Sequence, residues 1–166
     1  REIGGAVYSM TVYDKDGNLF MVNTGTEAAI KILMKDGKWE QLAYPGARQT
    51  TMGRLTISNQ NPNQKWVYSV RSTTGLLVFD DNGTIADQKD DQSVFKTAFQ
   101  YTETDNGQTK LMSVTPGFIS TLVQDLNGVI WVGTDAGPFL FQNLSKIYDP
   151  EYTCSRVKIP RNDGTG

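Results

Sequence analysis

The sequence has no histidine among its 166 residues and contains one cysteine, Cys154. Without histidine the chain cannot form a His-based catalytic triad, a histidine metal site or a histidine pH switch. A lone cysteine can form neither an internal disulfide nor a thiolate metal cluster. No apolar run approaches the roughly 20 residues that span a bilayer, so no membrane span is expected in this segment. These absences exclude most catalytic chemistries.

The sequence also has no large excess of positive or negative charge. The sequence has 16 Lys and Arg residues against 18 Asp and Glu residues, which gives a net charge of -2. Nucleic-acid-binding domains normally carry a basic stripe, so this balance disfavours a nucleic-acid partner. The length fits one domain better than two.

Turn signals are abundant, in the form of five Asp-Gly or Asn-Gly pairs that each lie between two strand-like runs. These pairs readily adopt positive φ and are typical of tight turns between antiparallel strands. The runs on either side are rich in β-branched and aromatic residues, which favour strands. The sequence therefore predicts an all-β fold. The pairs are Asp16-Gly17, Asp36-Gly37, Asn82-Gly83, Asn106-Gly107 and Asn127-Gly128.

Two of these turns belong to an internal repeat. Residues 14–20 match residues 125–131 without gaps, in the pattern Asp-x-[Asp/Asn]-Gly-x-x-aromatic. A degenerate third copy ends in Trp66, with Asn63 as the expected substitute for glycine. In this pattern Asp accepts hydrogen bonds from the turn, Gly takes positive φ, and the aromatic residue anchors the strand in the core. The signature residues are Asp14, Gly17, Phe20, Trp66, Asp125, Gly128, Trp131, Gly133 and Thr134.

The spacing of the repeat predicts a β-propeller. The separation of Phe20 and Trp66 along the sequence lies within the roughly 40–50-residue period of propeller blades. Four-stranded antiparallel blades are expected at approximately 7–44, 55–92 and 119–160, with an inserted hairpin at 93–115 and residues 84–88 as the fourth strand of the second blade. Because propellers typically have 4–8 blades, about three blades make an incomplete ring within residues 1–166.

Candidate catalytic groups have simpler interpretations. The acidic residues around Asn82-Gly83 lack the ligand spacing of a calcium loop, so a solvated turn is expected there. Cys154 has no histidine partner and is expected to be a small packed residue. The sequence therefore predicts no catalytic residue, no metal ligand and no cofactor. Trp39, Trp66 and Trp131 could form a sugar-stacking platform, but core anchoring is favoured for Trp66 and Trp131.

The expected blade geometry predicts where a ligand would bind. The short turns between strands 1–2 and 3–4 of each blade lie on one face of a propeller, and the longer loops lie on the other. Binding residues concentrate on loops that a rigid scaffold positions. The polar residues predicted for ligand binding on the loop face are Arg48, Gln49, Arg71, Ser72 and Asp135.

The run 118–137 resembles the two-component regulator propeller repeat, which reads approximately I-x-x-L-x-x-D-x-x-G-x-x-W-x-G-T-x-x-G. Residues 22–24 of the first unit depart from its Trp-x-Gly-Thr segment. The resemblance implies a non-catalytic, extracytoplasmic module of a Gram-negative bacterium, in the periplasm or on the cell surface. Gly137-Pro138 and the tail 158–166 are similar to the PorZ-like N-terminal propeller of type IX secretion, which implies binding of surface polysaccharide or partner proteins.

Two alternatives stay open. The repeat also occurs in the periplasmic sensor propellers of hybrid two-component histidine kinases, which recognise oligosaccharides and act in signal transduction. A propeller glycosidase or lyase is the third class, although no residues can be named for it. This segment is expected to contact the remainder of its own propeller, and secretion or signalling proteins are its expected partners. Open blade edges also favour self-association.

Overall fold

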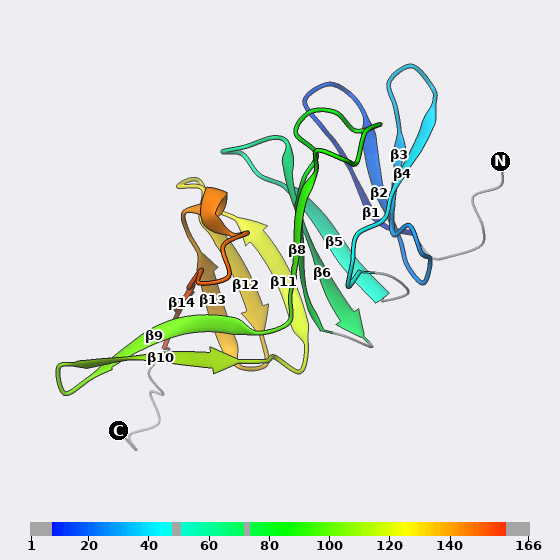
Figure 1. The fold of residues 1–166 in the computed structure, drawn as a ribbon. Coiled ribbons are helices and arrows are strands. Elements are labelled where there is room, and N and C mark those ends of the chain that lie inside the picture. The colour runs from blue at the N-terminus through cyan, green and yellow to red at the C-terminus, as the bar shows by residue number, and fades with distance from the viewer. Residues whose placement is uncertain (1–7, 48–50, 72–73, 159–166) are drawn as a thin grey trace.

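The computed structural model describes residues 8–47, 51–71 and 74–158. They form three four-stranded antiparallel sheets and a two-stranded hairpin, and within each sheet the strands follow one another in sequence order. The sheets stand side by side in chain order, and the hairpin extends past the third sheet (Figure 1). The all-β prediction is confirmed, and the three open sheets agree with an incomplete propeller.

The strand bounds are as follows. Sheet 1 contains β1 (Tyr8–Tyr13), β2 (Leu19–Asn23), β3 (Ile30–Leu33) and β4 (Trp39–Leu42). Sheet 2 contains β5 (Thr51–Ile57), β6 (Gln64–Arg71), β7 (Gly75–Asp80) and β8 (Gln92–Lys96). The hairpin is β9 (Phe99–Asp105) with β10 (Gln108–Val114). Sheet 3 contains β11 (Ile119–Gln124), β12 (Ile130–Thr134), β13 (Gly137–Phe141) and β14 (Ser155–Arg156).

All five predicted Asp-Gly and Asn-Gly turns connect neighbouring strands. Each of their glycines has positive φ, from 76° at Gly107 to 87° at Gly17 and Gly37. At Asn106-Gly107 both residues have positive φ, which is the requirement of the two-residue type I′ hairpin turn. The local turn chemistry therefore fixes where the strands reverse.

The prediction for Asn63 was wrong. This residue is absent from the described non-glycine residues with positive φ, which are Asn82, Asn106 and Asn143. The β5–β6 connection contains more residues than the β1–β2 connection. It reverses through a hydrogen bond from the Gln64 N–H to the Asn61 carbonyl. Because the longer loop spreads the reversal over more residues, no left-handed residue is needed at Asn63.

The expected fourth strand of the second unit, residues 84–88, was also wrong. Residues 81–91 form consecutive turns, with the Thr84 N–H bonded to the Asp81 carbonyl and the Asp87 N–H bonded to the Thr84 carbonyl. The strand is instead β8, which pairs with β7 from Asp80↔Gln92 to Leu76↔Lys96. The inserted hairpin is correspondingly shorter than residues 93–115, because residues 93–96 belong to sheet 2.

Sheet 2 is buried on both faces because it lies between the other two sheets. Leu77 and Phe79 pack in the core shared with sheet 1, whereas Leu76 and Val78 pack in the core shared with sheet 3. All four side chains are 0% exposed. Since successive side chains of a strand point to opposite faces, the middle sheet of a stack needs an uninterrupted apolar run.

The first strands of the three sheets adjoin one another. β1 contacts β5, and β5 contacts β11. This places the first strand of every sheet on a common inner side, as in the blades of a propeller. Within the described ranges, no helix is both long and apolar enough to cross a membrane.

Candidate functional site

The five residues predicted for ligand binding can be located only in part. Arg48, Gln49 and Ser72 lie outside the described residues, and Arg71 is the last residue of β6. Asp135 lies on the β12–β13 connection. Its carboxylate accepts hydrogen bonds from the Gly117 N–H, at 3.0 Å to each oxygen, and from the Phe118 N–H at 3.4 Å. It therefore holds the chain where it enters β11.

The two matching Asp turns have the same internal hydrogen bonds. The Asp14 Oδ1 atom accepts from the Asp16 N–H at 2.9 Å and the Asn18 N–H at 2.8 Å. In the other turn, the Asp125 Oδ1 atom accepts from the backbone N–H groups of residues 127 and 129, at 2.9 and 3.0 Å. Both carboxylates are thus committed to their own turns, as the repeat predicts.

The second carboxylate oxygen distinguishes the two turns. The Asp14 Oδ2 atom accepts from the Asn18 side-chain amide at 2.8 Å, whereas the Asp125 Oδ2 atom accepts from the Trp131 indole N–H at 2.9 Å. The Trp131 bond, together with backbone N–H groups of the turn, lowers the pKa of Asp125 below its ordinary value. A carboxylate with a lowered pKa that already accepts three hydrogen bonds is poorly suited to be a general acid.

Gly133 and Thr134 shape the turn that follows. The Thr134 hydroxyl donates to the Gly137 carbonyl at 2.8 Å and accepts from the Ala136 N–H at 3.0 Å. A Cβ atom at Gly133 would lie 2.8 Å from the Thr121 methyl group on β11. The Gly-Thr pair is therefore required by the close approach of two strands and by the turn itself.

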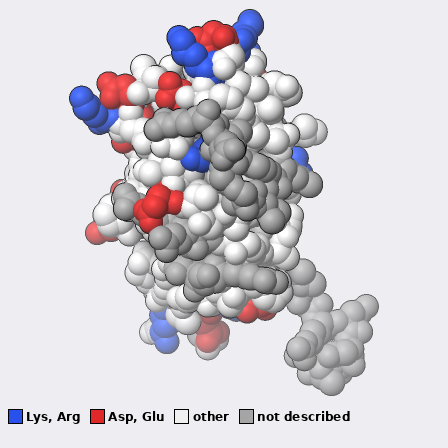
Figure 2. All heavy atoms as spheres, turned by 90° about the vertical axis from the view of Figure 1, so that its right-hand side faces the viewer, with Lys and Arg blue, Asp and Glu red and all other residues white. Residues whose placement is uncertain are grey.

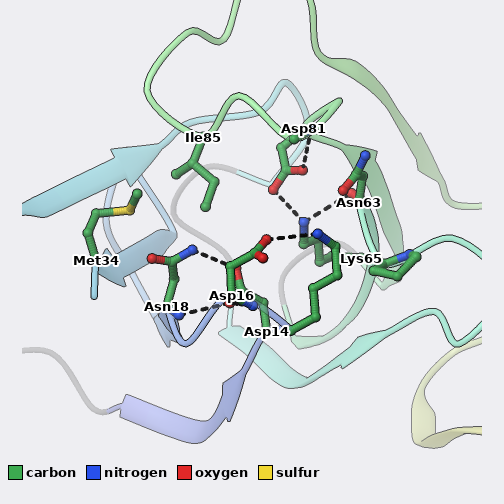
Figure 3. Close-up of a pocket in the computed structure, with 11 residues that line it drawn as sticks. Asp14, Asp16, Asn18, Met34, Asn63, Lys65, Asp81 and Ile85 are labelled. Carbon is green, nitrogen blue, oxygen red and sulfur yellow. Dashed lines mark hydrogen bonds and ion pairs between the residues drawn. The ribbon is translucent and has the colours of Figure 1, made fainter. Parts of the chain in front are cut away.

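A polar pocket of about 100 Å³ lies where sheets 1 and 2 present their short turns. Asp14 and Asn18 come from the β1–β2 turn, and Asn63 comes from the β5–β6 turn. Lys65 lies at the start of β6, and Asp81 comes from the loop after β7 (Figure 3). The pocket lies at the turn end of the sheets and not at the loop face predicted from the sequence. Charged side chains of both signs gather at this end (Figure 2).

Lys65 and Asp81 form a buried ion pair at the base of this pocket. Both side chains are 2% exposed. The Lys65 ammonium also donates to the Asn63 carbonyl at 3.1 Å and lies 4.9 Å from the centre of the Phe20 ring. Asp81 additionally accepts from the Gly83 N–H at 3.2 Å. Asp81, Asn63 and the Phe20 ring all lie around the Lys65 ammonium, so its positive charge is compensated within the fold.

The solvated turn predicted around Asn82-Gly83 is therefore wrong for Asp81, which is 1% exposed. Sequence reasoning also missed Lys65. One signal could have identified it, because the residue before the repeat aromatic is apolar in the other two copies, as Leu19 and Ile130. A lysine at a position that is apolar elsewhere in a repeat indicates a buried ammonium, which needs a carboxylate partner.

Metal-ligating residues do not cluster in the described part of the chain. No group of three His, Cys, Asp or Glu residues among them converges to hold a metal ion. Cys154 is buried, its thiol donates to the Gln100 carbonyl at 3.3 Å, and burial raises its pKa to about 12. It is the packed residue that the sequence predicted, with a thiol that stays protonated near neutral pH.

The three tryptophans lie on three different sheets and do not form a single platform. Trp66 is fully buried, with its ring at 5.6 Å and nearly edge-on to Phe141 of sheet 3, which confirms it as a core anchor. Trp39 on β4 is 47% exposed. Trp131 is 37% exposed, so the described residues do not bury it, and its role as a core anchor stays a prediction.

The reason for the exposure of Trp131 lies in the stack of sheets. Ile130 and Val132 pack toward sheet 2, so Trp131 points to the opposite face of sheet 3. Its register partners on that face are Val123, which is 52% exposed, and Leu140, which is half-buried. The outer face of sheet 3, defined by Val123, Trp131 and Leu140, is an apolar surface without a neighbouring sheet among the described residues.

Comparison with known proteins gave one informative result. No family model and no curated protein sequence matches the chain. A solved structure that does match is PorZ, described as an essential bacterial surface component of the type-IX secretion system of Porphyromonas gingivalis. The two share 25% sequence identity with a TM-score of 0.74 over 94% of this chain. The chain spans 21% of the length of PorZ.

Proposed function

We propose that this chain is a propeller segment of a PorZ-like surface component of type IX secretion, and that it acts as a non-catalytic scaffold and recognition module. The observation that carries the proposal is the likeness to PorZ, with a TM-score of 0.74 over 94% of the chain. An extracytoplasmic location follows from the same likeness. The resemblance of residues 118–137 to a regulator propeller repeat stays a prediction from the sequence, as does the sensor role it implies.

The chemistry of the described residues supports a role without catalysis. Asp14 and Asp125 hold turns, Asp81 neutralises Lys65, and Asp135 holds the start of β11. Each of these carboxylates has its partners within the fold. Paired acids of a glycosidase would instead face each other across an open cleft.

The outer face of sheet 3 supports a role as part of a larger ring. Phe20 and Trp66 occupy the same repeat position as Trp131, and each is buried by the sheet that follows it. A further four-stranded sheet would bury Trp131 in the same way. The full ring would then present its loop face to surface polysaccharide or to partner proteins of the secretion machinery.

Gene deletion in the bacterium that carries this protein tests the proposal. We expect deletion of the full-length gene to stop the appearance of type IX cargo at the cell surface, and complementation with the wild-type gene to restore it. A variant with Phe79→Ala, which opens a cavity in a fully buried site, should fail to restore secretion. The matched control Lys38→Ala, on an exposed turn, should restore it.

The same strains separate the secretion role from the sensor role. A sensor propeller would leave cargo secretion intact after deletion, and the cell would instead lose a transcriptional response to oligosaccharides. Normal secretion in the deletion strain would therefore contradict the proposed function. Protease treatment of intact cells provides an independent check, because a surface component must be accessible from outside.

A further inference from the structure

The β9–β10 hairpin presents one strand to sheet 3 and the other to solvent. Phe99 and Tyr101 of β9 are buried, with ring centres 5.3 and 5.8 Å from that of Phe139. β10, in contrast, is exposed at every position from Gln108 to Ser113. Among the described strands, β10 pairs with β9 alone. Its other edge is therefore open, on the outside of the hairpin (Figure 1).

The turn determines which backbone groups face the open edge. Across a two-residue type I′ turn, the flanking residues Asp105 and Gln108 form a hydrogen-bonded pair. Bonded and non-bonded pairs then alternate along the two strands. The N–H and C=O groups of Thr109, Leu111 and Ser113 consequently point away from β9. These three residues provide the pairing groups of the open edge.

This edge has few of the features that usually prevent pairing. Natural edge strands are protected by proline, bulges, charged side chains such as lysine, or short length. β10 is seven residues long, pairs with β9 without a register shift and contains no proline. Its one charged residue is Lys110, and Leu111 and Met112 are 64% and 38% exposed. An edge with a single charge and exposed apolar side chains is suited to adding another strand.

We propose that β10 pairs with β10 of a second copy of this chain, antiparallel about a twofold axis at Leu111. The two hairpins then form one continuous four-stranded sheet. In this register Leu111 lies opposite its own copy, Thr109 lies opposite Ser113, and Lys110 lies opposite Met112. No two like charges face each other directly, so the sequence of β10 is complementary to itself.

Backbone hydrogen bonds and an apolar contact would stabilise the proposed β10–β10 dimer. Each of the three outward residues exchanges two hydrogen bonds with its partner, which gives about six across the twofold axis. The two Leu111 side chains meet on the face of the new sheet that points away from sheet 3, because Phe99 and Tyr101 mark the opposite face. Dimerisation would therefore cover an apolar side chain that is 64% exposed in one copy.

Analytical ultracentrifugation of the full-length protein tests the pairing. We expect a reversible dimer, and we expect Leu111→Pro to raise its dissociation constant roughly tenfold or more, because proline removes an outward N–H from each copy. Proline is tolerated on an edge strand when its missing N–H would face outward, so β9 should stay paired. Leu111→Val is the matched control: it keeps the N–H and should leave the dimer intact.

Amide hydrogen exchange gives a readout that does not depend on any variant. In the wild-type protein, the amides of Thr109, Leu111 and Ser113 should gain protection as protein concentration rises. The amides of Lys110 and Met112 already bond to β9 and should be protected at every concentration. A protein that stays monomeric overturns the proposal, as does a dimer in which Leu111→Pro changes nothing and the three outward amides stay unprotected.

Discussion

Trp66 and Trp131 occupy the same position of the repeat but lie in opposite environments. Trp66 is fully buried between sheets 2 and 3, and its indole N–H donates to the Gln64 side chain at 3.0 Å. Trp131 is 37% exposed, and its indole N–H donates to Asp125. Both side chains point toward the side of their sheet on which the next sheet would lie, so the difference comes from that following sheet, which is described for Trp66 and not for Trp131. The environment of a repeat residue thus depends on whether a neighbour follows.

The two buried interfaces differ in chemistry as well. Trp66 belongs to an apolar interface rich in aromatic rings, in which Phe99, Phe139 and Phe141 pack edge to face. The interface between sheets 1 and 2 instead contains the Lys65 ammonium above the Phe20 ring. Both faces of β6 pack against apolar cores, but only the face toward sheet 1 also buries an ion pair.

The largest effect is expected at Trp66. Trp66→Ala should lower the free energy of unfolding by about 4 kcal/mol, because it removes a fully buried ring and leaves a cavity. Trp131→Ala is the matched control and should cost much less in this chain, since the Trp131 ring is partly in solvent. Urea unfolding of both variants measures the difference. Equal losses would contradict the contrast between the two positions.

The next effect is expected at the charged interface. Lys65→Met keeps most of the side-chain volume but leaves Asp81 buried without its cation, which should cost about 3 kcal/mol. The double variant Lys65→Met/Asp81→Asn has no buried charge and should recover most of this loss. Urea unfolding measures both variants. If the double variant is no more stable than the single one, packing rather than charge holds this interface.

A smaller effect on stability is expected at Asp125, and this effect should depend on pH. The folded protein lowers the pKa of Asp125, so its carboxylate contributes stability that is fully present above the unfolded pKa and disappears as pH falls through the folded pKa. Asp125→Asn should therefore lower the melting temperature near neutral pH and bring it closer to wild type at acid pH. An equal loss at every pH would show that charge is unimportant in this turn.

No change in stability is expected at the predicted loop-face residues. The double variant Arg48→Ala/Arg71→Ala should weaken binding of a surface polysaccharide or a secretion partner to the full-length protein while leaving the melting temperature near that of wild type. Calorimetric titration and thermal unfolding measure the two quantities. Unchanged affinity would remove these arginines from the candidate binding site.

The sequence predicted the parts of the fold that depend on local chemistry. The five Asp-Gly and Asn-Gly turns predicted between strands were placed correctly, since positive φ at a glycine such as Gly17 is a local property. β8 was missed because its residues were assigned to the inserted hairpin, and only the pairing with β7 places them in sheet 2. Lys65 was missed because its burial depends on a carboxylate 16 residues away. The exposure of Trp131 was not foreseen because it depends on a neighbouring sheet.

Radical footprinting of the full-length protein tests most directly whether this chain is part of a larger ring. Its tryptophans supply their own standards, because Trp39 is 47% exposed and should oxidise rapidly, whereas Trp66 is fully buried and should be protected. If another sheet follows sheet 3, Trp131 should be protected like Trp66. Oxidation of Trp131 as rapid as that of Trp39 would contradict the incomplete-propeller account.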